Sequence, residues 1–485
     1  MDRRLAAVVV AAGLVAAACG RGGDEAAPPS TTTTTAPSTT LPPPTTAPAP
    51  STTARGTTQP PAVARPAAAC PPIPDRAAPR PDRSHYTLQV DVKPAENAVD
   101  GRTDVRFTPD LPTDKLVLRL WANAPRIATR GARLDVAGVS VGGRPVPYTL
   151  TDATTLVAQP GSLAAGHAVD ISMPWRLTLP GTVDDRISRT GDAIRLGSFF
   201  PVVAWEPGIG WAEQPATSGF AEATTTAAAD FDATVTVPAG FDVLATGVAD
   251  GAGHWSAPGV PDFALSVGHF GEVTRTANAP QPVQVTVGVA AGIPEAPDTY
   301  AARIVAALED YGRRFGAYPW PTYTMAVTPG LNGGIEYPMH VLQGPGTSAH
   351  TTVHEAAHMW FYGLVEDNQG RDPWLDEALA TYAENRVLNS LASLRAAFIP
   401  LAGRGRAGEP MTYWEPRQDI YYRSVYLQGA QALAALGDPA LVDCALRLFV
   451  ARNAYRVARP KDLVDAAQAV FPDAAAVLAA YGIRG

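Results

Sequence analysis

Residues 353–360 read VHEAAHMW, and this stretch decides how the rest of the chain is interpreted. His354 and His358 stand four positions apart, so on a helix their imidazoles lie on one face, one turn apart, and can reach one metal ion. Glu355 lies about 100° around the helix from His354, beside the ion and not facing it. That position suits a base that takes a proton from the attacking water, so the motif predicts a catalytic metal site.

The residues after the motif predict a second helix that supplies a further ligand. A catalytic zinc ion has three protein ligands and an open fourth position for water. Residues 362–370 predict a turn and a loop, after which Asp372 is a typical N-cap and Pro373 a typical first helical residue. Glu377 follows in this helix, 19 positions after His358, and a helix returning onto the first would complete a site of two His and one Glu.

Two other polar residues compete for roles near the same ion. His350 lies one turn before His354, but ligands at 350, 354 and 358 on one straight helix would span about 12 Å. Bonds near 2 Å cannot bridge that distance, so we favour Glu377 as ligand and give His350 a supporting role. Glu384, two turns beyond Glu377, either holds one of the ligand imidazoles through its second nitrogen or is a surface carboxylate.

The surrounding segments resemble the M1 family of zinc aminopeptidases over about residues 85–435. The ligand spacing is the HExxH-x18-E pattern of gluzincins, and residues 333–338 (GGIEYP) resemble the family's GxMEN or GGMEYP exopeptidase motif. Residues 374–378 (WLDEA) resemble WLNEG, with Asp for Asn and Ala for Gly. Residues 426–430 (YLQGA) resemble YxKGA, with Gln for Lys, and residues 199–203 and 210–211 resemble parts of the saddle-shaped β domain. The C-terminal helical-repeat domain of larger members is missing.

This resemblance implies one Zn²⁺ ion held by His354, His358 and Glu377, with Glu355 as the catalytic base. It also implies that Glu336 binds the free α-ammonium of a peptide, the alternative for Glu336 being a carboxylate exposed on a turn.

Three more residues take their roles from the same resemblance. Gly333 and Gly334 leave backbone exposed for pairing with an extended substrate. Tyr426 donates its hydroxyl to the developing oxyanion. The alternative for Tyr426 is an aromatic ring packed beside its neighbours, Tyr413, Tyr421 and Tyr422.

The function that we expect is therefore a zinc-dependent aminopeptidase that hydrolyses N-terminal residues from peptides with a free N-terminus. One alternative is a zinc endopeptidase of thermolysin type, which has no use for Glu336. The other is a catalytically inactive M1-like binding protein, against which the intact Glu355 argues. The side-chain preference and the oligomeric state do not follow from the sequence.

The fold that we expect is α+β and multidomain. Residues 81–293 contain short alternating runs, such as 86–92, 231–237 and 283–289, separated by Gly, Pro and Asp, which predicts an N-terminal antiparallel β saddle or sandwich. Residues 299–315 have helical spacing, 322–327 form a strand, and helical patterns dominate from 349 onward. Residues 294–485 are thus expected to form a thermolysin-like, mainly helical zinc peptidase domain.

The N-terminus predicts export. Residues 1–18 have a short basic start and an apolar run too short to span a bilayer comfortably, typical of a signal peptide. Residues 15–19 (VAAAC) resemble a bacterial lipobox, which implies lipidation of Cys19 and anchoring at the outer face of the cell membrane. A plain secretion signal is the alternative. Residues 19–80 are rich in Thr and Pro and predict a disordered tether.

Composition sets the remaining limits. With 46% hydrophobic and 17% charged residues, the 485-residue chain has enough apolar material for a large core. Its net charge of −8 argues against a nucleic-acid-binding protein, which usually carries a basic surface. The scarcity of Lys beside Arg is typical of a bacterium with a GC-rich genome. Cys70 and Cys444 form either a disulfide or two free thiols.

Overall fold

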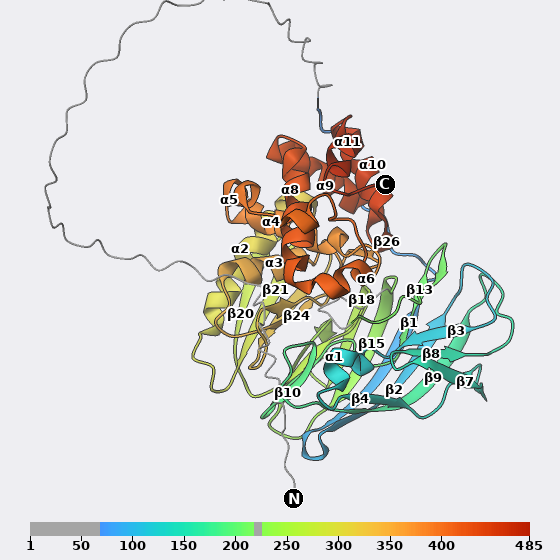
Figure 1. Cartoon of the computed structure of the whole chain (residues 1–485). Coiled ribbons are helices and arrows are strands. Elements are labelled where there is room, and N and C mark those ends of the chain that lie inside the picture. Colours follow the sequence, from blue (N-terminus) through green and yellow to red (C-terminus); the bar gives the residue numbers. More distant parts are fainter. Residues whose placement is uncertain (1–67, 218–225) are drawn as a thin grey trace, which may run out of the picture.

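A computed structural model describes residues 68–217 and 226–485 (Figure 1). The signal peptide predicted for residues 1–18, Cys19 and the tether up to residue 67 lie outside the described residues. The strands gather in the N-terminal part of the described chain, and the helices gather in the C-terminal part above them (Figure 1). This arrangement confirms the predicted fold class.

The largest sheet of the N-terminal part has the strand order β17-β18-β15-β1-β2-β9-β5-β6, with β4 also paired to β9. Inward and outward residues alternate along β1, as the sequence predicts for a sheet with one buried face. The sheet is antiparallel except that β1 and β15 pair in parallel, which the alternation does not reveal. Its strands are β1 His85–Lys93, β2 Ala98–Phe107, β4 Arg133–Val136, β5 Ser140–Val141, β6 Arg144–Pro145, β9 Val169–Thr178, β15 Ala229–Thr236, β17 Val248–Ala249 and β18 His254–Val260.

Two four-stranded sheets and a two-stranded ribbon complete this part. One sheet has the order β12-β3-β8-β7, with β3 Leu116–Arg119, β7 Tyr148–Asp152, β8 Thr155–Ala158 and β12 Val202–Val203. The other has the order β10-β11-β19-β16, with β10 Ile187–Thr190, β11 Ala193–Leu196, β16 Asp242–Ala245 and β19 Leu265–Gly268. The ribbon pairs β13 Trp205–Glu206 with β14 Gly210–Trp211, and the short helix α1 spans Pro125–Ala128.

A five-stranded sheet with the order β20-β21-β22-β24-β23 supports the helices. Its strands are β20 Phe270–Asn278, β21 Pro282–Ala290, β22 Thr322–Val327, β23 Gly334–Ile335 and β24 His340–Gln343. Because β21 pairs in parallel with β22, the predicted boundary between residues 293 and 294 divides one continuous sheet. The alternating pattern of β20 and β21 shows that they are strands, but it cannot show which sheet they join.

Helices cover this sheet and form the C-terminal body. α2 spans Pro297–Phe315 and packs on β20 and β21, while α3 (Ala349–Ala357) and α4 (Trp374–Val387) pack on each other. The others are α5 Leu391–Ala396, α6 Met411–Trp414, α7 Gln418–Tyr422, α8 Gln428–Ala435, α9 Pro439–Asn453, α10 Pro460–Val470 and α11 Ala474–Ala479. A two-stranded pairing joins β25 (Val365–Asp367) to β26 (Arg456–Ala458). Within residues 68–217 and 226–485, every helix is too short or too polar to cross a membrane.

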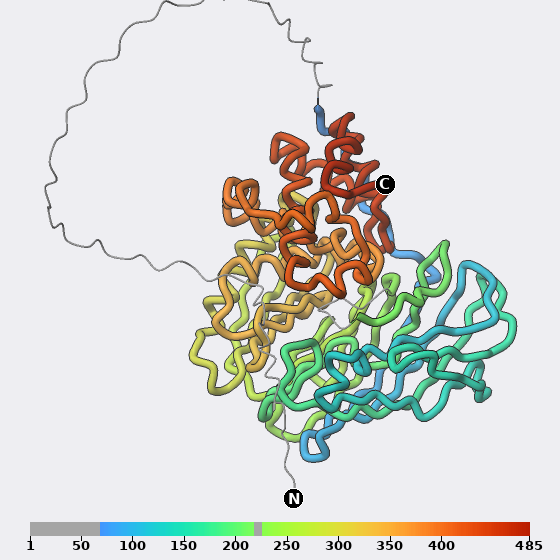
Figure 2. Tube along the Cα trace, viewed as in Figure 1, coloured from blue at the N-terminus to red at the C-terminus, as the bar shows by residue number. Residues whose placement is uncertain are grey.

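Residues 68–80 belong to the folded body, although the sequence assigns them to the tether. They form neither helix nor strand, but Cys70 is disulfide-bonded to Cys444 of α9. The Ala69 amide donates to the Val470 carbonyl at 3.2 Å, and the Ala77 amide donates to the Ala451 carbonyl at 2.8 Å. Figure 2 shows this segment in blue beside the C-terminal helices in red. The predicted tether therefore does not extend to residue 80, because the disulfide and these hydrogen bonds fix residues 69–77 to the folded body.

Candidate metal centre and active site

Helices α3 and α4 carry the residues predicted to bind the metal. Ser348 precedes α3 and caps it, accepting a hydrogen bond from the Thr351 amide at 3.4 Å. The helix ends at Ala357, so His358 takes the C-cap position. At the start of α4, Pro373 and not Asp372 occupies the N-cap, a correction to the sequence interpretation. The Asp372 carboxylate is used elsewhere, in an ion pair with Arg371 at 2.7 Å.

The three predicted ligands meet at one point. The Nε2 atoms of His354 and His358 lie 3.1 Å apart. The Glu377 Oε2 atom lies 3.2 Å from His354 Nε2 and 3.6 Å from His358 Nε2. Ligand atoms on a tetrahedral zinc ion with bonds of about 2.0–2.1 Å stand about 3.3–3.4 Å apart. The triangle therefore has the size that a zinc ion requires.

The other ring nitrogens are held by acceptors. His358 Nδ1 lies 3.1 Å from the Phe361 carbonyl oxygen, which can only accept a hydrogen bond, so Nδ1 carries the proton and Nε2 presents a lone pair. His354 Nδ1 lies 2.9 Å from Glu384 Oε2. Two imidazole lone pairs directed at each other call for a cation between them, and the carboxylate or carbonyl behind each ring is the usual orienting partner.

His350 supports this arrangement without joining it. Its Nδ1 lies 2.8 Å from Glu384 Oε1, and half of its side chain is exposed. Glu384 therefore bridges His350 and His354, and it is buried beside the site, unlike the surface carboxylate that the sequence left open.

The electrostatics of the buried ligands favour a positive charge at this point. Burial raises the pKa of Glu377, but hydrogen bonds from His354 and His358 outweigh it and hold the pKa at about 2. Burial lowers the pKa of His354, yet its bonds to Glu377 and Glu384 bring the net shift to well above the ordinary value. Glu377 and Glu384 thus stay ionised, and their negative charge favours a cation at this point.

A second group of acidic residues adjoins the metal triangle. Ligand atoms of Glu336, Glu355 and His358 all lie within 4.8 Å of one another, and the three side chains are buried. Burial, followed by the nearby charges of Glu377 and Glu355, raises the pKa of Glu336 well above its ordinary value. A buried carboxylate in this position gains most from a cationic partner.

The two glycines before Glu336 fit this crowded geometry. A Cβ atom added to Gly334 would lie 2.4 Å from Cγ of Glu355, so only glycine lets β23 lie this close to the Glu355 side chain. Gly333 has φ of +121°, in the region that favours glycine. β23 pairs with β24 on one side and is the last strand of its sheet in the described chain, and Gly334 in it lies against Glu355.

Tyr426 completes the group. Its hydroxyl donates to Glu377 Oε1 at 2.5 Å, and its ring stacks on the His354 ring with centroids 5.8 Å apart. The neighbours Tyr421 and Tyr422 contact the Tyr426 ring at its edge and at a tilt. Tyr426 lies in a π-helical turn, Arg423–Leu427, between α7 and α8. Such turns are frequent at functional sites because the extra residue turns a side chain away from the regular helix face.

Sequence reasoning named every ligand candidate at this site but missed two features. The carbonyl that holds His358 comes from Phe361, and no side-chain pattern can reveal a backbone acceptor. The π-helical turn also has no recognised sequence signature; the YLQGA resemblance located Tyr426 without it.

Comparison with known proteins supports the same assignment. No family model matches the chain. Among curated proteins, mouse aminopeptidase B is 32% identical over 124 residues, covering 24% of this chain and 19% of that protein. Human aminopeptidase B is 28% identical over 190 residues, covering 33% of this chain and 29% of that protein. The chain spans less than a third of the length of these relatives.

Solved structures match over most of the chain. The M1 zinc metallopeptidase from Deinococcus radiodurans superposes with a TM-score of 0.62 at 21% identity, covering 83% of this chain and 94% of that one. A mutant of it bound to a Tyr-Ser-Ala substrate gives a TM-score of 0.63 at 22% identity, with the same coverage. This chain therefore has the two-domain fold of the M1 zinc metallopeptidases, as the sequence motifs predicted.

Proposed function

We propose that this protein is an exported zinc aminopeptidase of the M1 type. The observation that carries the proposal is the buried Glu336 carboxylate, placed at the end of an edge strand within 4.8 Å of groups of Glu355 and His358. His354, His358 and Glu377 would hold the zinc ion. When bound, zinc would act as a Lewis acid toward the scissile carbonyl and lower the pKa of a water molecule in its open position.

The residues of the chain supply the remaining steps. Glu355 takes the proton of the attacking water and passes it to the leaving amine. Tyr426 donates its hydroxyl to the carbonyl oxygen as negative charge develops there. Glu336 accepts hydrogen bonds from the α-ammonium of the peptide, and the free edge of β23 pairs with the extended backbone. Since Glu336 lies directly beside the base, only the first peptide bond can reach Glu355.

The test compares substrates that differ only at the amino end. We expect aminoacyl-arylamides and free peptides to be hydrolysed, and N-acetylated peptides to be strongly disfavoured. Losing a charge-assisted bond worth roughly 2–3 kcal/mol, Glu336→Ala should lower kcat/KM for free-amine substrates about 30- to 150-fold. Its zinc content should stay that of the wild type.

Two outcomes would contradict the proposal. Equal cleavage of free and acetylated peptides by the wild type would favour a thermolysin-type endopeptidase. Absence of any hydrolysis by the zinc-loaded protein would favour the inactive binding protein. Glu309→Ala is the matched control, because this carboxylate bonds the Asn278 amide on the surface, remote in sequence from the motifs.

We further propose that a lipid on Cys19 holds the enzyme at the outer face of the cell membrane. The support is the lipobox-like sequence of residues 15–19 and the disulfide between Cys70 and Cys444. Disulfides persist in oxidising, extracytoplasmic compartments. Cell fractionation tests the anchor: the Cys19→Ala variant should leave the membrane fraction, and its retention there would contradict lipidation.

A further inference from the structure

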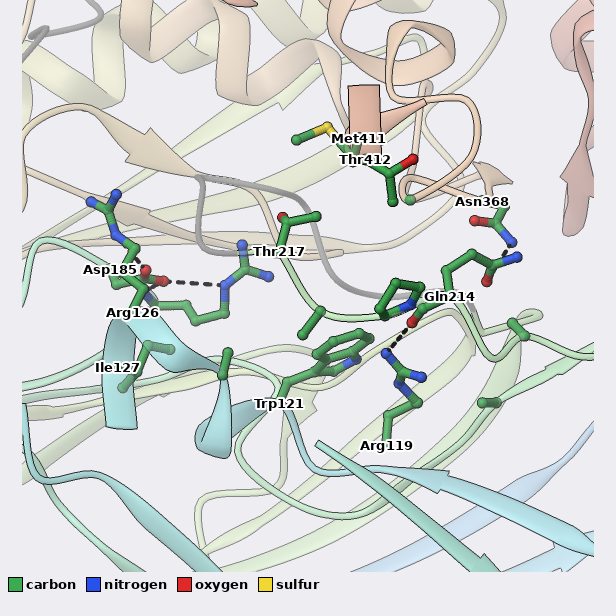
Figure 3. Close-up of a pocket in the computed structure, with 17 residues that line it drawn as sticks. Arg119, Trp121, Arg126, Ile127, Asp185, Gln214, Thr217, Asn368, Met411 and Thr412 are labelled. Carbon is green, nitrogen blue, oxygen red and sulfur yellow. Dashed lines mark hydrogen bonds and ion pairs between the residues drawn. The ribbon is translucent and has the colours of Figure 1, made fainter. Parts of the chain in front are cut away.

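A small cavity lies between the β-sheets of the N-terminal part and the helical body (Figure 3). Its floor comes from the segment of β3 and α1, and its roof comes from the loop around residues 368–370 and the start of α6. The cavity measures about 60 Å³. One water molecule needs roughly 10–15 Å³ by this measure, so the space suits a carboxylate-sized group and not a whole large side chain.

Arg119, the last residue of β3, lines this cavity and is only 3% exposed. Its Nη2 donates to the Gln214 carbonyl at 2.7 Å, and its guanidinium lies 4.1 Å from the centroid of the Trp121 ring. Figure 3 shows the guanidinium pointing from β3 toward Gln214. The Nε and Nη1 atoms are buried and have no hydrogen-bond partner.

Arg195 shows what a purely structural buried arginine looks like in the same chain. Its exposure is 1%, similar to that of Arg119. All of its guanidinium nitrogens donate to acceptors, which are Val183 O at 2.7 Å, Pro329 O at 2.7 Å, Thr328 Oγ1 at 3.0 Å, Gly330 O at 3.2 Å and Asp185 O at 3.3 Å. Buried donors are normally satisfied in this way. Arg119 departs from that rule at two of its three guanidinium nitrogens.

The charges around the cavity do not neutralise Arg119 by direct contact. The nearest carboxylates are committed to other groups: Asp152 accepts from Thr154 at 2.6 Å, and Glu213 pairs with Lys115 at 2.7 Å. Within the lining, Asp185 pairs with Arg126 at 2.9 Å. Arg119 therefore remains a buried cation with two donors available for an anionic group.

Two segments that line the cavity are bonded to segments that carry residues of the catalytic site. Asn368 and Gly370 line it, and Gln369 between them donates to Asp376 at 2.9 Å, directly before the ligand Glu377. On the opposite wall, Asp184 precedes the lining residue Asp185 and accepts from the Asn332 amide at 2.8 Å. Asn332 directly precedes the glycines of β23. Arg186 also lines the cavity, and its charge acts on Glu336, so the cavity adjoins the residue proposed to hold the amino end of the peptide.

We propose that the cavity is a subsite for a carboxylate of the peptide substrate, bound by the guanidinium of Arg119. The carboxylate comes from an acidic side chain or from the carboxyl end of a short peptide. This inference rests on the proposed peptidase function, and it adds a specificity that the catalytic residues do not provide.

The experiment uses three matched substrate pairs with the full zinc-loaded protein. They are glutamyl- and glutaminyl-arylamide, an amidated tripeptide with Glu or Gln in its second position, and a tripeptide with a free or an amidated carboxyl end. We expect the wild type to prefer the charged member of at least one pair by about 10- to 100-fold in kcat/KM. The pair that responds identifies the source of the carboxylate.

Variants assign that preference to the cavity. Arg119→Gln should bring the responding pair close to parity. Arg106→Gln removes the same charge from the exposed ion pair with Asp170 and should retain the preference. Ala124→Leu fills the cavity from a partly exposed position, so it tests the proposal even where Arg119→Gln does not fold. No preference in the wild type, or a preference that survives Arg119→Gln or Ala124→Leu, would overturn the proposal.

A binding measurement separates this inference from the proposed function. Calorimetry on Glu355→Gln protein, with both members of each of the three pairs as probes, reports the carboxylate subsite without turnover. If the wild type hydrolyses no arylamide, the peptidase function fails, whereas a 10-fold or greater difference in Kd that Arg119→Gln removes would still support the subsite. Equal Kd values within all three pairs would overturn it.

Discussion

Three largely buried histidines, His340, His354 and His358, lie within 19 residues of one another. The groups that contact their ring nitrogens differ in chemical type. His340 lies between two hydroxyls, with Thr324 Oγ1 at 2.7 Å from Nδ1 and Ser266 Oγ at 3.1 Å from Nε2. His354 lies between two carboxylates. Clustering of histidines in the sequence therefore does not identify a metal site; the acidic partners do.

The same difference explains their electrostatics. Burial alone lowers the pKa of His340 to about 3, so it stays neutral. For His354 the bonds to Glu377 and Glu384 reverse the effect of burial and raise the pKa. His340 connects β19 of the N-terminal part to β22 and β24 beneath the helices, whereas His354 and His358 present lone pairs to a cation.

The largest expected effect comes from removing the acidic ligand. Glu377→Gln should lose stoichiometric zinc and all measurable arylamide hydrolysis, because the triangle loses its only anionic ligand. Chelation of the wild type should have the same effect and zinc should reverse it, with metal content measured by mass spectrometry.

Two further variants serve as controls for Glu377→Gln. Glu355→Gln should keep its zinc while kcat falls about 10²- to 10⁴-fold, since the base is no ligand. His340→Gln should keep both zinc and activity. Zinc bound stoichiometrically by active Glu377→Gln protein would remove Glu377 from the ligand set.

A smaller effect is expected from Glu384, which orients His354 without facing the ion. Glu384→Ala should weaken zinc binding about 10- to 100-fold, the usual cost of losing a partner behind a ligand imidazole. Competition with a chromogenic chelator measures this change. Glu384→Gln retains an acceptor and should restore part of the affinity. Unchanged affinity in Glu384→Ala would show that the contact at 2.9 Å has no orienting role.

The sequence predicted those parts of the molecule that depend on spacing within one element. A period of two predicted the strands, a spacing of four placed His354 and His358 together, and the following helix supplied Glu377. What it could not predict depends on contacts between distant segments. Three such features arise only in the folded chain: the parallel pairing of β1 with β15, the position of β21 in the five-stranded sheet, and the acceptors around Arg119.

Departures from the family motif illustrate the same limit. Ala378 stands where the resembling motif has Gly, and the sequence alone cannot show how its methyl group is accommodated. The structure shows that Gly429 of α8 faces it, since a Cβ atom added to Gly429 would lie 2.4 Å from that of Ala378. The close approach of α4 and α8 is therefore kept by a glycine on the opposite helix.

The smallest expected effect is on the free energy of unfolding, and it tests whether His340 is neutral in the folded protein. In the folded state the pKa of His340 is lowered to about 3, from an ordinary value of 6.5. The stabilisation that depends on neutral His340 is thus fully present above pH 6.5. It is lost as the pH falls toward 3, because the unfolded chain then binds a proton that the folded chain excludes.

We therefore expect the wild type to lose on the order of a few kcal/mol of unfolding free energy from this residue between pH 6.5 and 3. His340→Gln cannot take up that proton. It should be less stable than the wild type at pH 7.5, where the imidazole packs and bonds best, and the difference should shrink or reverse near pH 4. Denaturant titration at several pH values measures the difference, with the exposed His167→Gln as control. If the difference stays constant with pH, His340 is not held neutral by burial, and the contrast with His354 rests on the carboxylates alone.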